Sequence, residues 1–177
     1  MTALRTTSFG HNRQRYLSIM FAGTIAGTLD IFSALIDGRI RGLRPLIVLQ
    51  AISSGILGRP AFKGGIGTAI LGTILHYLIA LTAALVYFAA SLKIRSMNQR
   101  YIVAGLLYGS AIYVFMTFVV VPLSAAPFKL ATSLWRVLTG LSVHMLCIGL
   151  PISTIARKFS GQDSRDEDLD PELPSPI

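Results

Sequence analysis

Four long apolar runs dominate the hydrophobic pattern of the chain, at 17–36, 66–90, 101–121 and 132–156. Even the shortest of them, with 20 residues, would form a helix of about 30 Å, which is the thickness of a bilayer's hydrocarbon core. Charged or turn-forming residues separate the runs. The pattern therefore predicts an all-α, polytopic membrane protein built as a bundle of four transmembrane helices.

A fifth apolar run, at 45–58, is too short to cross a membrane, because its 14 residues give only about 21 Å of helix. Two interpretations stay open for it. It is either a re-entrant half-helix that enters the bundle, or an interfacial helix on the membrane surface with Gln50 towards the headgroups. Both place a short helix between the first and second spans.

The charges divide the chain into a membrane domain, 16–158, and two tails. We expect the basic N-terminal tail, 1–15, to be disordered or to lie on the membrane surface. The acidic tail, 159–177, is typical of disorder in its composition.

The net charge is unevenly distributed along the chain. Residues 161–177 carry a net charge of −5 and the other 160 residues carry +13. Such a basic excess would suggest nucleic acid in a soluble protein. Here the bases flank the spans, where they meet anionic lipid headgroups, so the predicted partner is the bilayer and not nucleic acid.

The distribution of basic residues also predicts the orientation of the chain in the membrane. With the N-terminus inside, nine Lys and Arg residues fall in cytoplasmic segments and six in external segments. Because basic residues are retained on the cytoplasmic side, this count favours both termini inside. Three arginines in the external connector 38–45 run against the trend.

Four ionisable side chains lie within the predicted spans: Asp30, His76, Arg136 and His144. Keeping Asp or Arg at mid-bilayer costs at least about 2.5 kcal/mol on insertion scales, so each such group is a functional hypothesis by default. Counting residues along the helices puts Asp30 and Arg136 in the same half of the bilayer, and the two histidines at similar depth. We predict a polar cluster of these four, joined by Gln50 if its helix is re-entrant.

Structural roles are the first explanation to consider for the same residues. Asp30 and Arg136 could form an ion pair that fixes how the first and fourth helices dock, and each histidine could be a hydrogen-bonded core residue. Proton relay and metal binding are the functional alternatives. The single cysteine, Cys147, excludes an internal disulfide. No ligand spacing points to a metal, because Asp30 and the histidines lie on different helices, so we predict neither a metal site nor a cofactor.

Small residues recur at helical spacing in the spans, and they predict where the helices pack. Gly23 and Gly27 share one face with Asp30, and glycines four residues apart let a second backbone approach closely. The same faces could join two copies of the chain as a homo-oligomer. The predicted packing glycines are Gly23, Gly27, Gly72, Gly105, Gly109 and Gly140.

Several short segments give the chain a resemblance to small uncharacterised bacterial inner-membrane proteins of the YagU-like type. They are TLDIF, LQAISSGILGRPAF, AGLLYG and VVVPLSAAPF, together with spans that carry His76 and His144. The resemblance implies four helices in a bacterial plasma membrane and brings no catalytic or binding residues. The chain differs from the YagU type in having no long loop between its first two spans.

These features favour a non-enzymatic membrane protein that passes a small solute, an ion or protons, or modulates another membrane protein. One alternative is a structural or interaction subunit that oligomerises through its glycine-rich helix faces. The other is an intramembrane enzyme that acts on lipid or quinone. The sequence holds no G-x-S-x-G or H-E-x-x-H motif, and its glycine-rich stretches lack the lysine of a phosphate-binding loop.

Overall fold

The computed structural model describes residues 4–127 and 133–168, and it describes side chains for 13–127 and 133–159. Every regular element in this part of the chain is a helix. Four helical stretches are long and apolar enough to cross a membrane, namely Arg13–Ile40, Gly65–Lys93, Tyr101–Leu123 and Leu134–Phe159. The structure therefore confirms the all-α fold with four candidate spans.

The first two spans are single helices, α1 (Leu4–Ile40) and α3 (Gly65–Lys93), whereas the other two are composite. The third consists of α5 (Tyr101–Phe115), the π-helix η2 (Met116–Val120) and α6 (Val121–Leu123). The fourth consists of α7 (Leu134–Val143), the π-helix η3 (His144–Gly149) and α8 (Leu150–Asp168). The short elements are α2 (Pro45–Leu57), the 3-10 helix η1 (Arg59–Lys63) and α4 (Arg95–Gln99).

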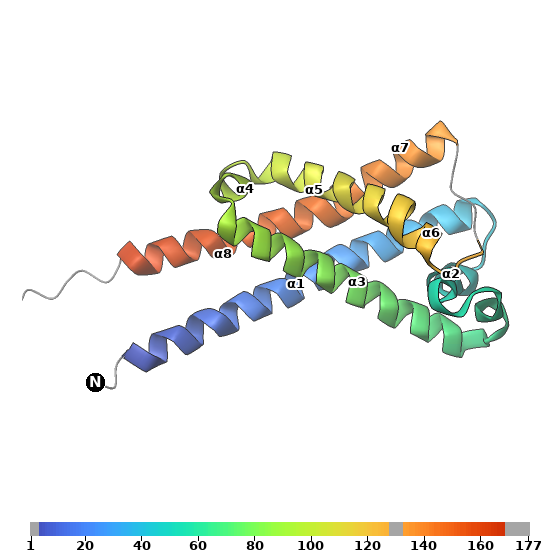
Figure 1. Ribbon diagram of the computed structural model, residues 1–177, viewed down its shortest axis with the longest axis horizontal. Coiled ribbons are helices and arrows are strands. Elements are labelled where there is room, and N and C mark those ends of the chain that lie inside the picture. The colour runs from blue at the N-terminus through green and yellow to red at the C-terminus, as the bar shows by residue number, and fades with distance from the viewer. Residues whose placement is uncertain (1–3, 128–132, 169–177) are drawn as a thin grey trace, which may run out of the picture.

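Helices α1 and α8 form the centre of the bundle, with α3 packed on α1 and α5 packed on η3 and α8. The start of α1 and the end of α8 lie at one end of the molecule (Figure 1). The opposite end holds α2, the end of α1 and the starts of α3 and α7 (Figure 1). Four crossings thus return the chain to the end at which it begins.

Small residues let the helix backbones touch, as the glycine pattern predicts. A Cβ atom added to Gly23 would lie 2.8 Å from the Cα of Leu81, and one added to Gly109 would lie 2.7 Å from the Cα of Met145. Side chains larger than hydrogen would therefore push these helices apart. The six predicted packing glycines all meet a neighbouring segment of the same chain: Gly23, Gly27, Gly72, Gly105, Gly109 and Gly140.

The hydrophobic core fills the half of the bundle that holds the start of α1 and the end of α8. Ala22 and Ala26 of α1 meet Ala84 and Tyr87 of α3 and Ile152 of α8, and all five are fully buried. The ring of Tyr108 lies edge-on to that of Tyr87, 5.0 Å between centroids, and its hydroxyl donates to the Ala83 carbonyl at 2.6 Å. This half is closed by close-packed side chains.

Each π-helix ends two residues before a proline, Pro122 after η2 and Pro151 after η3. A proline within a helix has no amide to donate and its ring clashes with the carbonyl four residues earlier. Those carbonyls belong to Phe118 and Cys147, which lie in the π-helices, where the wider turn relieves the clash. The third span therefore passes through Pro122 and ends at Leu123, whereas the sequence pattern predicted its end at 121.

The two predicted tails are more helical than their composition indicates. Helix α1 begins at Leu4 and α8 continues to Asp168, so 4–15 and 159–168 extend the first and last spans. Neither stretch contains proline, and each residue added to an existing helix gains a hydrogen bond without a new nucleation step. The rest of the predicted tails, 1–3 and 169–177, lies outside the described residues.

Helix α2 packs against the first turns of α3. Gln50 is buried there, and its Nε2 donates to the Gly65 carbonyl at 2.8 Å. The Gly55 carbonyl accepts from the amide of Ala125 at 2.9 Å. Gln50 thus faces α3. The interfacial interpretation had placed it towards the headgroups. The protein cover suits a re-entrant helix, and the level of α2 relative to the bilayer stays a prediction.

Candidate functional site

A cavity of about 940 Å³ opens at the end of the bundle where α1 ends and α7 begins. Its wall is formed by α1, the α5–η2 segment and α7, with Pro127 at its edge. Here α1 packs on α3, η3 and α8 but makes little contact with α7, so the two diverge and leave space. We call this cavity the pocket, and its ionisable residues are Asp30, Asp37, Arg41, Arg136 and His144.

The floor of the pocket lies about half-way through the bundle. Asp30 precedes the end of α1 by 10 residues and His144 follows the start of α7 by 10, which places each about 15 Å from the mouth at 1.5 Å per residue. Below the mouth, Ser33 Oγ lies 3.4 Å from Cys147 Sγ and links α1 to η3. Beyond this level the buried core begins.

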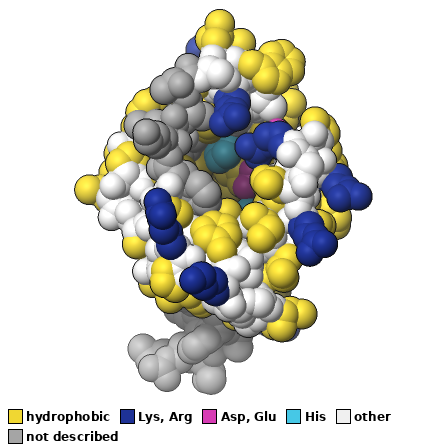
Figure 2. Space-filling view, turned by 90° about the vertical axis from the view of Figure 1, so that its right-hand side faces the viewer, with side chains coloured by type: hydrophobic (Ala, Val, Ile, Leu, Met, Phe, Trp, Pro, Cys, Tyr) yellow, Lys and Arg dark blue, Asp and Glu magenta, His cyan; other side chains and the backbone are white. Residues whose placement is uncertain are grey.

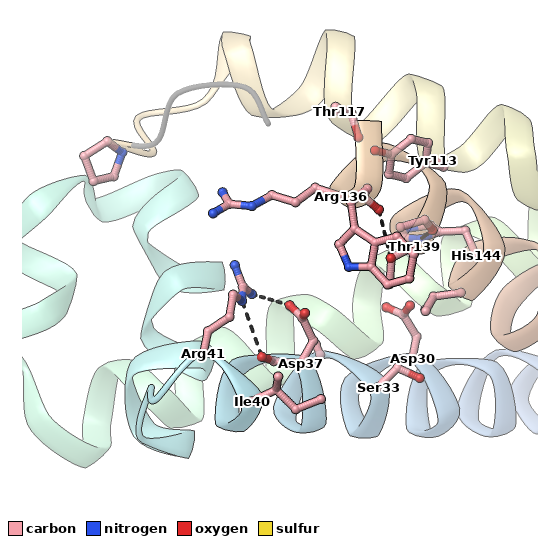
Figure 3. A pocket seen from close by; sticks show the side chains of 15 residues that line it. Asp30, Ser33, Asp37, Ile40, Arg41, Tyr113, Thr117, Arg136, Thr139 and His144 are labelled. Carbon is pink, nitrogen blue, oxygen red and sulfur yellow. Dashed lines mark hydrogen bonds and ion pairs between the residues drawn. The ribbon is translucent and has the colours of Figure 1, made fainter. Parts of the chain in front are cut away.

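Asp30 and Arg136 both line the pocket, yet they do not form the ion pair that their depths allow. The Asp30 carboxylate points into the pocket, whereas the Arg136 side chain extends towards the mouth (Figure 3). In the described part of the chain, neither side chain has an ion pair or a side-chain hydrogen bond. Residue counting along the helices could not give the direction in which each side chain extends.

A second carboxylate in the wall is neutralised by a residue close to it in the chain. Asp37, in the last turn of α1, forms an ion pair with Arg41, the first residue after that helix, and Arg41 Nε also donates to the Asp37 carbonyl at 3.3 Å. Sequence analysis missed both residues, because it ended the first span at 36. The signal was present in their i, i+4 spacing, which suits an ion pair on a helix that continues to Ile40.

His144 brings an imidazole to the floor of the pocket. Its Nδ1 donates to the Gly140 carbonyl at 2.9 Å, and its ring lies edge-on to that of Tyr113, 5.3 Å between centroids. A carbonyl only accepts hydrogen bonds, so the proton is on Nδ1, and Nε2 keeps its lone pair in the neutral ring. His144 is also the first residue of η3, and π-helical turns occur frequently at functional sites.

The other two members of the predicted cluster lie elsewhere. His76 donates from Nε2 to the Gly27 carbonyl at 2.7 Å, which ties α3 to α1. Gln50 lies between α2 and α3. The predicted cluster of five therefore separates into three pocket residues and two interhelical ones. Among the side chains that the structure describes, 13–127 and 133–159, no three of His, Cys, Asp or Glu gather as metal ligands would.

Basic side chains surround the mouth of the pocket. Viewed from that end, the molecule shows a hollow with a carboxylate and an imidazole at its bottom and Lys and Arg side chains around it (Figure 2). Arg41 and Arg136 line the hollow itself. We call the set at this end of the described chain the basic rim: Arg39, Arg41, Arg44, Arg59, Lys63 and Arg136.

We compared the chain with protein-family models, curated proteins and solved structures. None of them matches it. The resemblance to YagU-like proteins therefore stays a prediction, and the functional interpretation depends on the geometry of the pocket.

Proposed function

We propose that this chain is a bacterial plasma-membrane protein that admits a small solute, an ion or protons into the pocket and mediates their passage. The main support is Asp30, a carboxylate about 15 Å below the mouth that lines an open cavity and has no partner among the described residues. A charge at such depth costs folding free energy unless it is paired or hydrated. A role in substrate or proton handling explains why it is kept.

His144 supports the same proposal, because it adds a second titratable group at the level of Asp30 from a different helix. Two such groups facing one water-accessible cavity can exchange protons with it or bind a polar solute. Passage of a solute from the pocket to the other side of the membrane requires a conformational change, since the core around Tyr87 and Ile152 closes the half of the bundle opposite the pocket. Both π-helices contribute to the pocket lining, with Thr117 from η2 and His144 from η3, and π-helical turns occur frequently at functional sites.

The orientation forms part of the proposal. The start of α1 and the end of α8 lie at the closed end of the molecule (Figure 1), and the excess of basic residues on that side favours a cytoplasmic location for it. The pocket would then open to the outside of the cell.

The structural-subunit alternative has less support. Its sequence basis was the set of glycine-rich faces, and those glycines contact other segments of the same chain. A homo-oligomer or a contact with another membrane protein would need a different surface.

Labelling of a cysteine placed in the pocket tests the proposal. The double variant Ser33→Cys, Cys147→Ser exchanges the two side chains that contact each other below the mouth, so that the contact still joins one hydroxyl and one thiol. We expect this thiol to react with a membrane-impermeant maleimide added outside intact cells. The control is Ile74→Cys in the Cys147→Ser background, at similar depth but on an exposed face of α3, where lipid should protect it.

If the thiol of Ser33→Cys reacts neither in intact cells nor in permeabilised cells, the pocket is closed to solution and the proposal is wrong. Reaction only after permeabilisation would keep the pocket and reverse the orientation. Given a reactive thiol, proton flux into liposomes by the wild type, lost in Asp30→Asn, is the expected second result.

A further inference from the structure

The basic rim is the least expected feature of the bundle. Basic residues are normally depleted at the external ends of spans, yet six of them surround the mouth of the pocket. Within the wall, the charge of Arg41 is balanced by Asp37. Arg136 has no counter-ion among the described residues, although it lines the cavity. The mouth therefore carries a positive excess centred on the pocket.

This excess decides which solutes the pocket attracts. The lining holds two carboxylates and two guanidinium groups, but the charge at the mouth is of one sign. Charge of one sign at the mouth of a cleft with low-dielectric walls raises the local concentration of counter-ions and repels ions of its own sign. A cation would have to pass the basic rim before it reached Asp30. Among the described residues, an anion meets no unpaired negative charge before Asp30, because the Asp37 carboxylate in the wall is paired with Arg41.

We infer that the pocket takes small oxyanions, of the carboxylate or phosphate class, and that they bind at the mouth between Arg136 and Arg41. This inference rests on the proposed function and names its substrate class. The two guanidinium groups come from α7 and from the residue after the end of α1, and they extend towards the same space, while the Asp30 carboxylate lies deeper (Figure 3). Guanidinium groups bind planar or tetrahedral oxyanions through paired N–H donors.

Asp30 limits how far the anion moves in this structure. Its carboxylate, about 16 Å along α1 from Arg41 at 1.5 Å per residue, repels a second negative charge from the floor. The anion site is therefore at the level of the guanidinium groups, and a free solute or the phosphate of a lipid headgroup could supply the same chemistry.

The only tryptophan of the chain, Trp135, reports on this site, because it precedes Arg136 and lines the pocket. Full-length protein in nanodiscs of zwitterionic lipid is titrated with iodide, caesium or acrylamide as quenchers at constant ionic strength. The quenching efficiency of each ion is expressed relative to its quenching of free tryptophan. On that scale we expect iodide to quench Trp135 at least about threefold more efficiently than caesium. The reason is that one unit charge at about 5 Å in water changes local ion concentrations by such a factor.

Two variants locate the effect. Arg136→Gln should lower iodide quenching about threefold and leave acrylamide quenching unchanged. Arg44→Gln removes the same charge from the basic rim outside the pocket wall, and it should change iodide quenching by less than about 1.5-fold because the charge is distant and screened. Inorganic phosphate, replacing chloride at equal ionic strength, should reduce iodide quenching of the wild type in a saturable way and have no such effect on Arg136→Gln.

Other outcomes separate the two claims. Equal iodide and caesium quenching, or a phosphate effect that does not saturate, would overturn the oxyanion site, even where the labelled Ser33 thiol shows that the pocket is open. Phosphate competition that is seen in zwitterionic nanodiscs and lost in nanodiscs with phosphatidylglycerol would support the site and assign it to lipid headgroups. Competition that persists there would assign it to free oxyanions.

Discussion

The contact between α5 and η3 leaves no room for a side chain at Gly109, and this makes a sharp prediction for Gly109→Ala. The three nearest atoms to an added Cβ are all backbone atoms, with Met145 Cα at 2.7 Å and the His144 carbonyl carbon at 2.8 Å. Ordinary contact begins near 3.4 Å, so the two helices must separate by more than half an ångström. Backbone atoms cannot rotate away as a side chain can.

The expected size follows from two opposing effects. Alanine gains up to about 1 kcal/mol over glycine in a helix interior. Overpacking costs about 1–3 kcal/mol, and the backbone contact puts Gly109 at the upper end of that range. We expect a net loss of about 2 kcal/mol, or a fall in Tm of about 4–8 °C for a chain of this size.

Gly67→Ala is the matched control, because Gly67 also lies within a helix, α3, and has nothing within 4 Å of its added Cβ. Here only the gain in helix propensity remains, so Tm should stay the same or rise by up to about 4 °C. The assay is thermal unfolding in a mild detergent. A fall in Tm for both variants, or for neither, would show that the close approach at Gly109 does not control stability.

Two further predictions use the same assay. A double-mutant cycle of Asp30→Asn and Arg136→Gln should give a coupling energy within about 0.5 kcal/mol of zero, and Asp30→Asn alone should leave Tm unchanged or raise it, because the two residues are not paired in the pocket. A coupling of several kcal/mol would instead establish an ion pair. His76→Leu should cost about 1 kcal/mol, since it removes the donor to the Gly27 carbonyl. Partial recovery in His76→Gln would assign that loss to the hydrogen bond, whereas equal loss in both would assign it to packing.

The spans were predictable from sequence because apolar length determines whether a helix can cross a membrane. The position of a residue along its helix could be counted as well, because a helix rises by a fixed amount for each residue. The wall that a residue faces was not predictable, since it depends on which helices are neighbours. His76 lies on α3, which packs on α1 outside the pocket, so an expected cluster residue became an interhelical bond. The unpaired state of Arg136 depends on a long side chain whose direction no spacing determines.

The π-helices were not predictable either. The sequence pattern predicted that the third span ends at 121, whereas the structure continues it through an i→i+5 turn that begins at Met116, and a second such turn begins at His144. Their positions depend on how α5 packs on η3, and a single sequence does not contain that information.

The same π-helices have a consequence for insertions and deletions. A π turn holds about one residue more than an α turn, so deleting one residue from 144–149 would restore a regular helix without shortening either flank. The wider turn absorbs the extra residue, so after this deletion the stretches on either side would keep the faces they present, with Arg136 on the pocket wall and Ile152 in the core. A deletion within the α-helical stretch 137–143 has no such turn to absorb it, and there the residues before it, Arg136 included, would rotate by about 100° relative to α8. The span should therefore tolerate the loss of one codon in 144–149 better than the loss of one codon in 137–143.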